Sequence, residues 1–165
     1  MATLNLSRTE RLLIAANSDN RGFIKRYSGL ILNVIQKQPT VAKVKNVKCF
    51  RISVYEKYIS KRLGIPIGAR KNKKIEIPNR ILKSEVNIIR YLRGLYEAEG
   101  SFCVHKATSI YKFLFSNRNK SLIRNVEMLL RRLNFHLHIS SHQVQISKKE
   151  EFYRAIDLLK FRYYV

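Results

Sequence analysis

The stretch Leu92–Gly100, with the sequence LRGLYEAEG, constrains this chain more than any other feature. Apolar residues at helical spacing lead into it, and Gly94 and Ala98, one turn apart, allow a second helix to approach closely. The predicted helix then ends on two carboxylates, Glu97 and Glu99, followed by a glycine. Carboxylates at a helix C-terminus cost up to about 1 kcal/mol, because they face the negative end of the helix dipole. This placement predicts a cation beside the helix end.

The net charge narrows the choice of partner. The chain has 165 residues, enough for one or two small domains, and its 33 Lys and Arg against 11 Asp and Glu give a formal charge of +22. The basic residues are spread along the whole chain, which favours a folded basic surface over a basic tail. Nucleic acid is therefore the favoured partner, and an anionic membrane surface is a poor second.

Several features predict an intracellular protein, in the cytoplasm, nucleoid or an organelle, that is not secreted and has no membrane partner. No apolar run approaches the ~20 residues that span a bilayer. The N-terminal sequence MATLNLSRTER lacks the apolar core of a signal peptide. The two cysteines, Cys49 and Cys103, are too few for a zinc site and are expected to be reduced.

Hydrophobic periodicity in the C-terminal half predicts the order helix, two strands, helix, two strands, helix. Ser84 is suited to cap the first helix at its start and Gly100 at its end. The predicted elements are the helix Ser84–Ala98, the strands Ser101–Ser109 and Tyr111–Ser116, the helix Asn119–Leu133, the strands Phe135–Ser140 and Gln143–Ser147, and the helix Glu150–Phe161.

The N-terminal half echoes this order and predicts an internal duplication. Its first copy lacks a counterpart of the helix that ends in Glu97 and Glu99. We therefore expect residues 1–78 to form an incomplete half and residues 79–165 to form the half with that helix. The elements predicted for the first copy are the strand Leu12–Ala16, a helix that continues through Val34 until Pro39, the strands Val41–Val44 and Lys48–Ser53, and the helix Val54–Leu63.

At these residues the chain resembles the LAGLIDADG homing endonucleases. Leu92–Gly100 follows the family signature: Leu, any residue, Gly, Leu, aromatic or aliphatic, acidic, Ala, acidic, Gly. Tyr58–Gly68 followed by Lys74–Pro78 looks like the segment before the second motif in single-chain members, and the turn Ser116–Arg118 is also family-like. The resemblance covers essentially the whole chain, most clearly from about Phe50 onward.

The resemblance implies an α+β fold in which antiparallel sheets form a DNA-binding saddle with helices packed behind them. It also implies an intron-encoded endonuclease whose partner is double-stranded DNA and whose cofactor is Mg²⁺. Glu99 would be the catalytic, metal-binding acid, Gly100 would belong to the metal site, and Glu97 occupies a position that is more often structural. Two motif helices would pack side by side through the residues corresponding to Leu92, Gly94, Leu95 and Ala98.

The outward faces of the predicted strands and turns are polar and basic, as expected of a surface that reads DNA. The histidines have no spacing typical of a metal site, so we interpret them as exposed strand residues. The cluster Arg70–Lys74 is either a solvated linker or a phosphate contact. The candidate DNA-binding residues are Arg51, His105, Lys112, Arg118, His136, His138, Gln143, Gln145 and Lys148.

The chain carries one signature where two-half members carry two. The favoured hypothesis is a metal-dependent DNA endonuclease that forms a homodimer through the Leu92–Gly100 helix and so has two acids. A single chain with one acid would at best nick DNA. Two other hypotheses stay open: a DNA-binding regulator or remnant without nuclease activity, and an RNA-binding or splicing-assisting protein. Phosphate neutralisation alone does not distinguish DNA from RNA.

Overall fold

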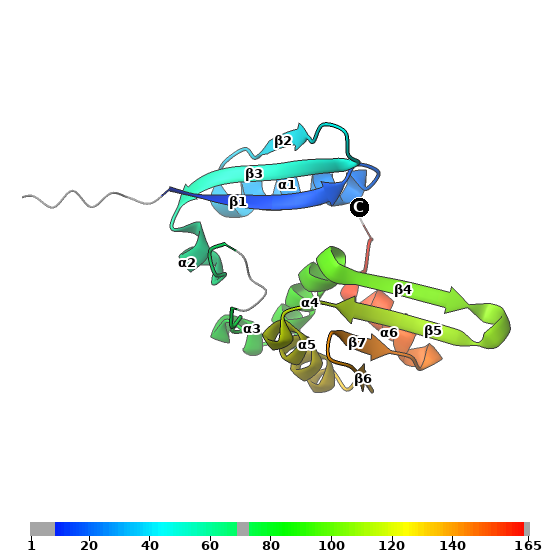
Figure 1. The fold of residues 1–165 in the computed structure, drawn as a ribbon. Coiled ribbons are helices and arrows are strands. Elements are labelled where there is room, and N and C mark those ends of the chain that lie inside the picture. Colours follow the sequence, from blue (N-terminus) through cyan, green and yellow to red (C-terminus); the bar gives the residue numbers. More distant parts are fainter. Residues whose placement is uncertain (1–8, 69–72, 164–165) are drawn as a thin grey trace, which may run out of the picture. The chain divides into compact units, whose positions relative to one another are not determined.

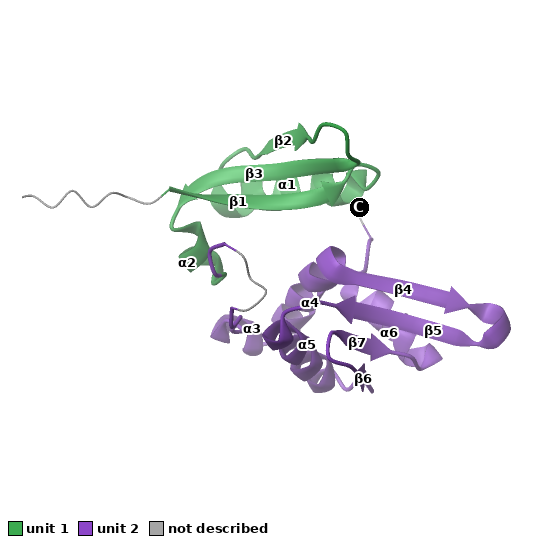
Figure 2. Ribbon diagram, viewed as in Figure 1, with its two compact units in different colours: residues 1–65, 164–165 green, residues 66–163 purple. Residues whose placement is uncertain are grey.

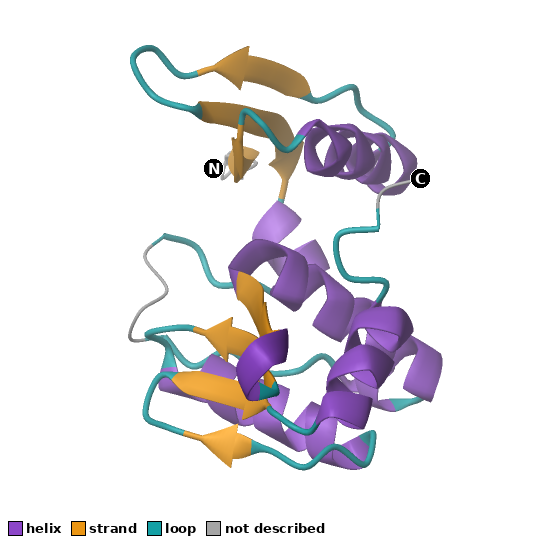
Figure 3. Ribbon diagram, turned by 90° about the vertical axis from the view of Figure 1, so that its right-hand side faces the viewer, coloured by secondary structure: helices purple, strands orange, loops and turns teal. Residues whose placement is uncertain are grey.

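The computed structural model describes residues 9–68 and 73–163 (Figure 1). The chain forms two compact units, which divide between Ile65 and Pro66 and are called unit 1 and unit 2 (Figure 2). Each unit is an antiparallel sheet with helices on one face, so the predicted α+β architecture is confirmed (Figure 3). The predicted division of the chain into halves after residue 78 stays a prediction.

Unit 2 contains a four-stranded sheet in the order β4-β5-β7-β6. Helices α4, α5 and α6 lie on one face of it (Figure 1). Its elements are α3 (Asn79–Leu82), α4 (Glu85–Glu99), β4 (Gly100–His105), a 3-10 turn (Lys106–Thr108), β5 (Ile110–Ser116), α5 (Lys120–Arg132), β6 (His138–Ile139), β7 (Gln143–Ile146) and α6 (Lys149–Leu159).

Local sequence explains where the main helices of unit 2 begin. The side chain of Ser84 accepts a hydrogen bond from the backbone N–H of Asn87, which caps α4 as predicted. Asn119 caps α5 by accepting from the N–H groups of Ser121 and Leu122. The apolar stripe of α5 and the alternating aromatic residues of β5 point into one core, with the buried residues Tyr111, Phe113, Phe115, Ile123, Val126, Leu129, Leu130 and Leu133.

Two predicted strands in unit 2 are shorter than expected. The strand expected to reach Ser109 ends at His105, because the chain reverses through the 3-10 turn and a left-handed Ser109 with φ 52°. The strand expected over Phe135–Ser140 is reduced to β6, because Phe135 is buried and the backbone N–H of His136 donates to the carboxylate of Glu151 instead of to a neighbouring strand.

Unit 1 contains a three-stranded sheet in the order β1-β3-β2, with α1 on one face. The helix predicted over Val54–Leu63 is confirmed only for Ile59–Leu63 and is wrong for Val54–Lys57, because β3 pairs with β1 along its whole length and so stays extended to Lys57. The elements of unit 1 are β1 (Thr9–Asn17), α1 (Arg21–Ile35), β2 (Thr40–Lys43), β3 (Cys49–Lys57) and the short α2 (Ile59–Leu63).

The internal repeat is visible in the hydrogen bonds as well as in the element order. After β1, the N–H of Ser18 donates to the carbonyl of Lys48, and after β5 the N–H of Asn117 donates to the carbonyl of His142. The sheet order β1-β3-β2 of unit 1 matches β5-β7-β6 of unit 2. Among the residues that the structure describes, unit 1 has no counterpart of α4 and β4.

Candidate active site

The two carboxylates at the C-terminal end of α4 differ in burial. The side chain of Glu97 is fully buried and its Oε1 lies 2.8 Å from Nε of Arg93, one turn earlier. Nη2 of Arg93 also donates to the backbone carbonyl of Tyr163 at 2.7 Å. Glu99, the last residue of the helix, is exposed. Glu97 is thus committed to an internal ion pair, whereas Glu99 is accessible to a ligand.

Gly100 joins α4 to β4 at a point where no side chain fits. Its N–H donates to the carbonyl of Tyr96, so it caps the helix as predicted, but with extended backbone dihedrals (φ −87°, ψ 154°). A Cβ atom at this position would lie 2.4 Å from the Tyr96 carbonyl oxygen and 2.7 Å from Cδ1 of the same residue. The Tyr96 ring cannot easily move, because it stacks on Phe113 with centroids 4.4 Å apart.

Replacing Gly100 with alanine is expected to destabilise unit 2 by about 1–3 kcal/mol, because the added methyl group overlaps backbone and ring atoms of Tyr96. Urea denaturation would measure the loss. Ser101→Ala, at the exposed next position, serves as the matched control. Equal stability of the two variants would contradict the steric argument.

Glu99 lines a cavity of about 760 Å³ within unit 2. Two predicted helix-packing residues, Leu95 and Ala98, and the predicted DNA contact Arg118 lie in the same cavity wall. Four other polar residues there were not among the predicted site residues, namely Ser116, Asn117, Asn119 and His142. The complete lining is Ile75, Leu95, Ala98, Glu99, Ser116, Asn117, Arg118, Asn119, Leu122 and His142.

The possible metal ligands at this helix end favour an ion that also binds a phosphate. They do not favour an ion whose ligands all come from the protein. Within residues 9–68 and 73–163, no group of three or more His, Cys, Asp or Glu side chains gathers to hold a metal. Mg²⁺ commonly binds one or two carboxylates plus phosphate oxygens and water, and Glu99 supplies one accessible carboxylate. The carbonyl of Gly100, the other predicted metal-site residue, already accepts a hydrogen bond from Nη2 of Arg162 at 3.4 Å.

Strand register brings most of the predicted DNA-contacting residues of unit 2 onto one face, the face opposite the helices. We call this the outer face. Lys112 lies directly opposite Cys103, and Gln145 lies opposite Leu114 on one side and His138 on the other. Residues directly opposite one another in antiparallel strands share a face. The predicted residues on the outer face are His105, Lys112, His138, Gln143 and Gln145.

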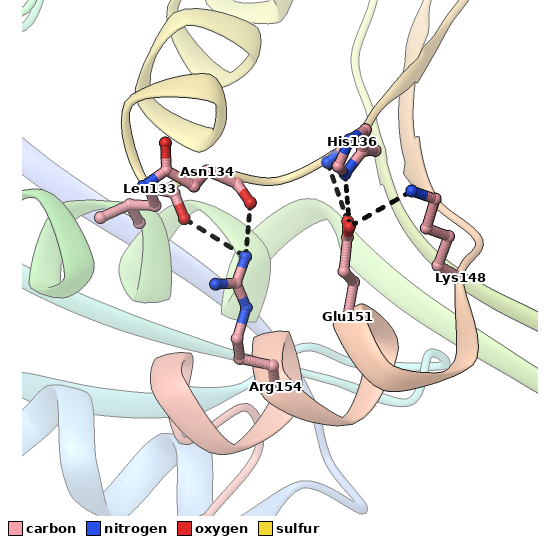
Figure 4. A network of polar contacts seen from close by, with 6 residues as sticks. All are labelled: Leu133, Asn134, His136, Lys148, Glu151 and Arg154. Carbon is pink, nitrogen blue, oxygen red and sulfur yellow. Dashed lines mark hydrogen bonds and ion pairs between the residues drawn. The ribbon is translucent and has the colours of Figure 1, made fainter.

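Two other predicted contacts, His136 and Lys148, are engaged elsewhere (Figure 4). The backbone N–H of His136 donates to Oε2 of Glu151 at 2.8 Å, and its Nδ1 lies 2.5 Å from Oε1. Nζ of Lys148 lies 3.9 Å from the same Oε1. Because Glu151 belongs to α6, this network draws both side chains toward the helical layer.

The remaining predicted DNA contacts do not lie on the outer face of the unit 2 sheet. Arg51 is exposed on β3 of unit 1, opposite Ala15 and Ala42, and so belongs to the other sheet. Residues 70–72 of the Arg70–Lys74 cluster lie outside the described residues. Lys74 is exposed and forms an ion pair with Glu76 at 2.8 Å.

The contacts of Glu151 predict a dependence of stability on pH. Burial opposes ionisation of this carboxyl, but hydrogen bonds from the backbone and ring of His136 outweigh it and lower the pKa of Glu151 below its ordinary value of 4.5. A lowered folded-state pKa gives stability that is present above the ordinary value and is lost as pH falls through the folded value. Urea denaturation from pH 6 down to about pH 3 should therefore show a smaller acid-induced loss for Glu151→Gln than for the wild type. Parallel pH profiles for the two proteins would refute the assignment.

Comparison with known proteins shows which family this fold resembles. Residues 87–164, which contain most of α4 and the whole sheet of unit 2, match the family model described as the LAGLIDADG-like domain. Over these residues, and in its fold, the chain is similar to the LAGLIDADG family. The matched residues include Glu99 and Gly100 at the end of α4. No curated protein matches the chain in sequence.

Solved structures share the LAGLIDADG fold. A variant of the homing endonuclease I-DmoI, in complex with its target DNA in the presence of Mg, matches with a TM-score of 0.60 and 18% identity over 94% of this chain and 84% of that one. I-DmoI in complex with DNA and Mn matches with a TM-score of 0.58 and 18% identity over 94% and 84% of the two chains. The N-terminal LAGLIDADG domain of DUF199/WhiA matches with a TM-score of 0.58 and 11% identity over 94% and 73%.

Among the described residues, none of the helices combines the length and apolar character that crossing a bilayer requires.

Proposed function

We propose that this protein is a sequence-specific DNA endonuclease that hydrolyses phosphodiesters with a divalent metal ion at Glu99. The observation that carries the proposal is the accessible carboxylate of Glu99 at the end of the motif helix, in a cavity that also contains Arg118. The formal charge of +22 provides the attraction to a polyanion that a carboxylate alone would oppose. Complexes of I-DmoI with DNA and with Mg, Mn or Ca support a divalent ion, and we propose Mg²⁺.

In the proposed reaction, Glu99 would hold the ion. When bound there, the ion would supply the chemistry of metal-dependent hydrolysis, namely a polarised phosphate and a more acidic water. Arg118, from the turn after β5, neutralises charge on the phosphate. His142 lines the same cavity and is available to hydrogen-bond a phosphate oxygen or the water.

We further propose that the outer face of the unit 2 sheet reads the major groove. Gln143 and Gln145 have side-chain amides that can pair with adenine edges, and Lys112 adds a charge for a phosphate or a guanine. Arg51, on the equivalent strand of unit 1, makes the corresponding contact from the other sheet.

Substitutions on the outer face are expected to separate specificity from general affinity. Gln145→Ala should reduce discrimination at one base pair by about 1–3 kcal/mol, because it removes a base-edge contact. Lys112→Ala should weaken binding to all sequences and lower the slope of log K against log salt by about 1, because one phosphate contact is lost. Fluorescence anisotropy over a salt series measures both effects.

Arg132→Ala is the matched control for Lys112→Ala, since Arg132 is exposed on α5, on the helical side of the sheet. If both variants change the salt slope equally, the proposal that DNA binds to the outer face is wrong.

We propose a homodimer through the Leu92–Gly100 helix as the form that cuts both strands. Each strand needs a carboxylate near its scissile phosphate, and the described residues contain a single motif helix. The exposed Ala98 and the half-buried Gly94 and Leu95 leave a side of α4 that a second helix can approach. Solution mass with and without DNA tests this arrangement, and a monomer on DNA would leave nicking as the activity.

A second candidate function is specific DNA binding without cleavage. It is favoured by the single helix of the α4 type among the described residues, because cutting both strands of a duplex needs two acids. The decisive experiment is incubation with a target-site library in Mg²⁺ or Mn²⁺, with and without a chelator. Chelator-sensitive cutting supports the endonuclease. A tight, specific complex that is never cut in either metal would replace it with the binding function.

A further inference from the structure

A second cavity in unit 2, of about 540 Å³, adjoins the cavity that contains Glu99, since the two share part of their walls. The shared residues are Arg118, Asn119 and His142. None of the described residues that line the second cavity carries a carboxylate. Its basic side chains are Lys73, Lys74, Arg118 and Lys120. A cavity of this composition attracts an anion.

Neighbouring groups offset little of this positive charge. Lys74 forms an ion pair with Glu76 at 2.8 Å, and Nζ of Lys73 donates to the neutral backbone carbonyl of Ile67. Within the part of the chain that the structure describes, neither Arg118 nor Lys120 forms an ion pair. The cations around the cavity repel one another, so a bound anion stabilises the site.

Two of the lysines belong to residues 73–77, a segment that α5 and its cap hold in place and that we call the strap. Nδ2 of the buried Asn119 donates to the carbonyl of Lys73 at 2.8 Å. The backbone N–H of Ile75 donates to Oγ of Ser121 at 2.9 Å. Nδ2 of Asn125 donates to the carbonyl of the same isoleucine at 2.8 Å. These bonds fix the backbone that carries the two lysines at the cavity.

The internal repeat shows that the fold alone does not require this arrangement. Asn20 caps α1 as Asn119 caps α5, so Asp19 is equivalent to Arg118. The equivalent of the serine that binds the strap is Gly22, which has no side chain. In unit 1 the cavity beside this turn therefore contains an acid among its basic residues. The cavity without an acid occurs in the unit that carries Glu99.

We propose that the second cavity binds the phosphodiester next to the scissile one on the same DNA strand. Lys73, Lys74 and Lys120 bind this phosphate, and Arg118 contributes to both cavities. The inference rests on the proposed function, because it takes the phosphate in the Glu99 cavity as the scissile one. Cavities that share wall residues hold neighbouring anions, as consecutive phosphates of one strand are. A phosphate fixed beside the scissile group restricts its motion and so orients it for reaction.

The salt dependence of duplex binding tests the contact, in EDTA and without divalent metal. The double substitution Lys73→Gln with Lys74→Gln should lower the slope of log K against log salt by about 1, since each neutralised phosphate contributes ~0.9. Lys83→Gln with Arg132→Gln is the matched control, because it removes the same charge from exposed positions outside the cavity. Its slope should equal that of the wild type. No step needs cleavage, so failure here is separate from failure of the proposed nuclease.

Asn125 is a positioning residue in this proposal, because it binds the strap and not the phosphate. Asn125→Ala should lower the salt slope by about 1 in the wild type and leave it unchanged in the Lys73→Gln, Lys74→Gln background. A role in stability alone would not change the slope. Circular dichroism checks that the variant is folded, and Ser121→Ala, which removes the other bond to Ile75, provides a second variant.

Ethylation interference on the tightest-binding duplex of a target-site library locates the phosphates. The lysine double variant should lose interference at one phosphate, and Arg118→Gln at that phosphate and the next one on the same strand. These losses in a protein that does not cut would refute the nuclease but retain the paired phosphate sites. An unchanged slope for the lysine variant, an equal loss in its control, or affected phosphates that are not consecutive would overturn the proposal.

Discussion

Replacing Glu99 with glutamine is expected to lower the rate of metal-dependent DNA cleavage by at least about 100-fold. The neutral amide keeps the size of the side chain but loses the charge that holds a divalent ion, and such an ion contributes several kcal/mol to stabilisation of the transition state. DNA affinity without metal should stay the same or rise slightly, because a negative charge is removed from a basic surface. Single-turnover cleavage and anisotropy on the same duplex measure the two effects.

Glu127→Gln is the control for this prediction. Glu127 is a partly exposed carboxylate on α5 that pairs with Arg131, so its loss changes net charge equally but at a distance from the motif. Cleavage should be unaffected. If the Glu99→Gln variant cuts at the wild-type rate, Glu99 has no part in the reaction and the proposed site is wrong.

Replacing Arg93 with methionine is expected to destabilise unit 2 by about 3 kcal/mol, because it removes the guanidinium that contacts the fully buried Glu97 carboxylate. Methionine retains most of the apolar volume of the arginine stem, so the loss reports on charge. The variant also loses the hydrogen bond from Arg93 to the carbonyl of Tyr163. Urea unfolding measures the change.

A second Arg–Glu ion pair between residues four apart on one helix provides a close control. Arg131 and Glu127 also lie four residues apart with Nε and Oε1 in contact, at 3.0 Å, but both side chains are partly exposed. Arg131→Met should change stability by less than about 1 kcal/mol, as is usual for surface ion pairs. Adding Glu97→Gln to Arg93→Met should recover part of the stability, since no buried charge then remains. Additive losses would show that the pair is not coupled.

Much of the fold could be predicted from local sequence. The caps Ser84 and Asn119 and the apolar stripe of α5 act within one or two turns, so their helices were predicted within a residue or two. The alternation of Tyr111, Phe113 and Phe115 was sufficient to predict which face of β5 is buried. The internal repeat was predicted from element order and is confirmed by the matching sheet orders.

The errors arose where pairing with a distant segment decided the structure. Val54–Lys57 was predicted to be helical, yet it is held as strand by β1, about forty residues earlier in the chain. Phe135–His136 was predicted to be strand, yet Phe135 lies beneath the guanidinium of Arg154, 4.0 Å from its ring centroid, and His136 is bound to Glu151. A prediction from the propensities of a few neighbouring residues does not take these distant partners into account.

The amino-acid sequence by itself determined the motif helix, its acidic end and the basic character of the chain, because helix periodicity, capping and net charge are local or additive properties. Only the tertiary structure decided that Glu97 is buried against Arg93 while Glu99 is exposed beside Arg118 and His142. It also decided that His136 and Lys148 turn toward Glu151, and that unit 1 leaves Leu30 and Val34 uncovered. These outcomes depend on which distant elements pack together, and burial is a property of that packing.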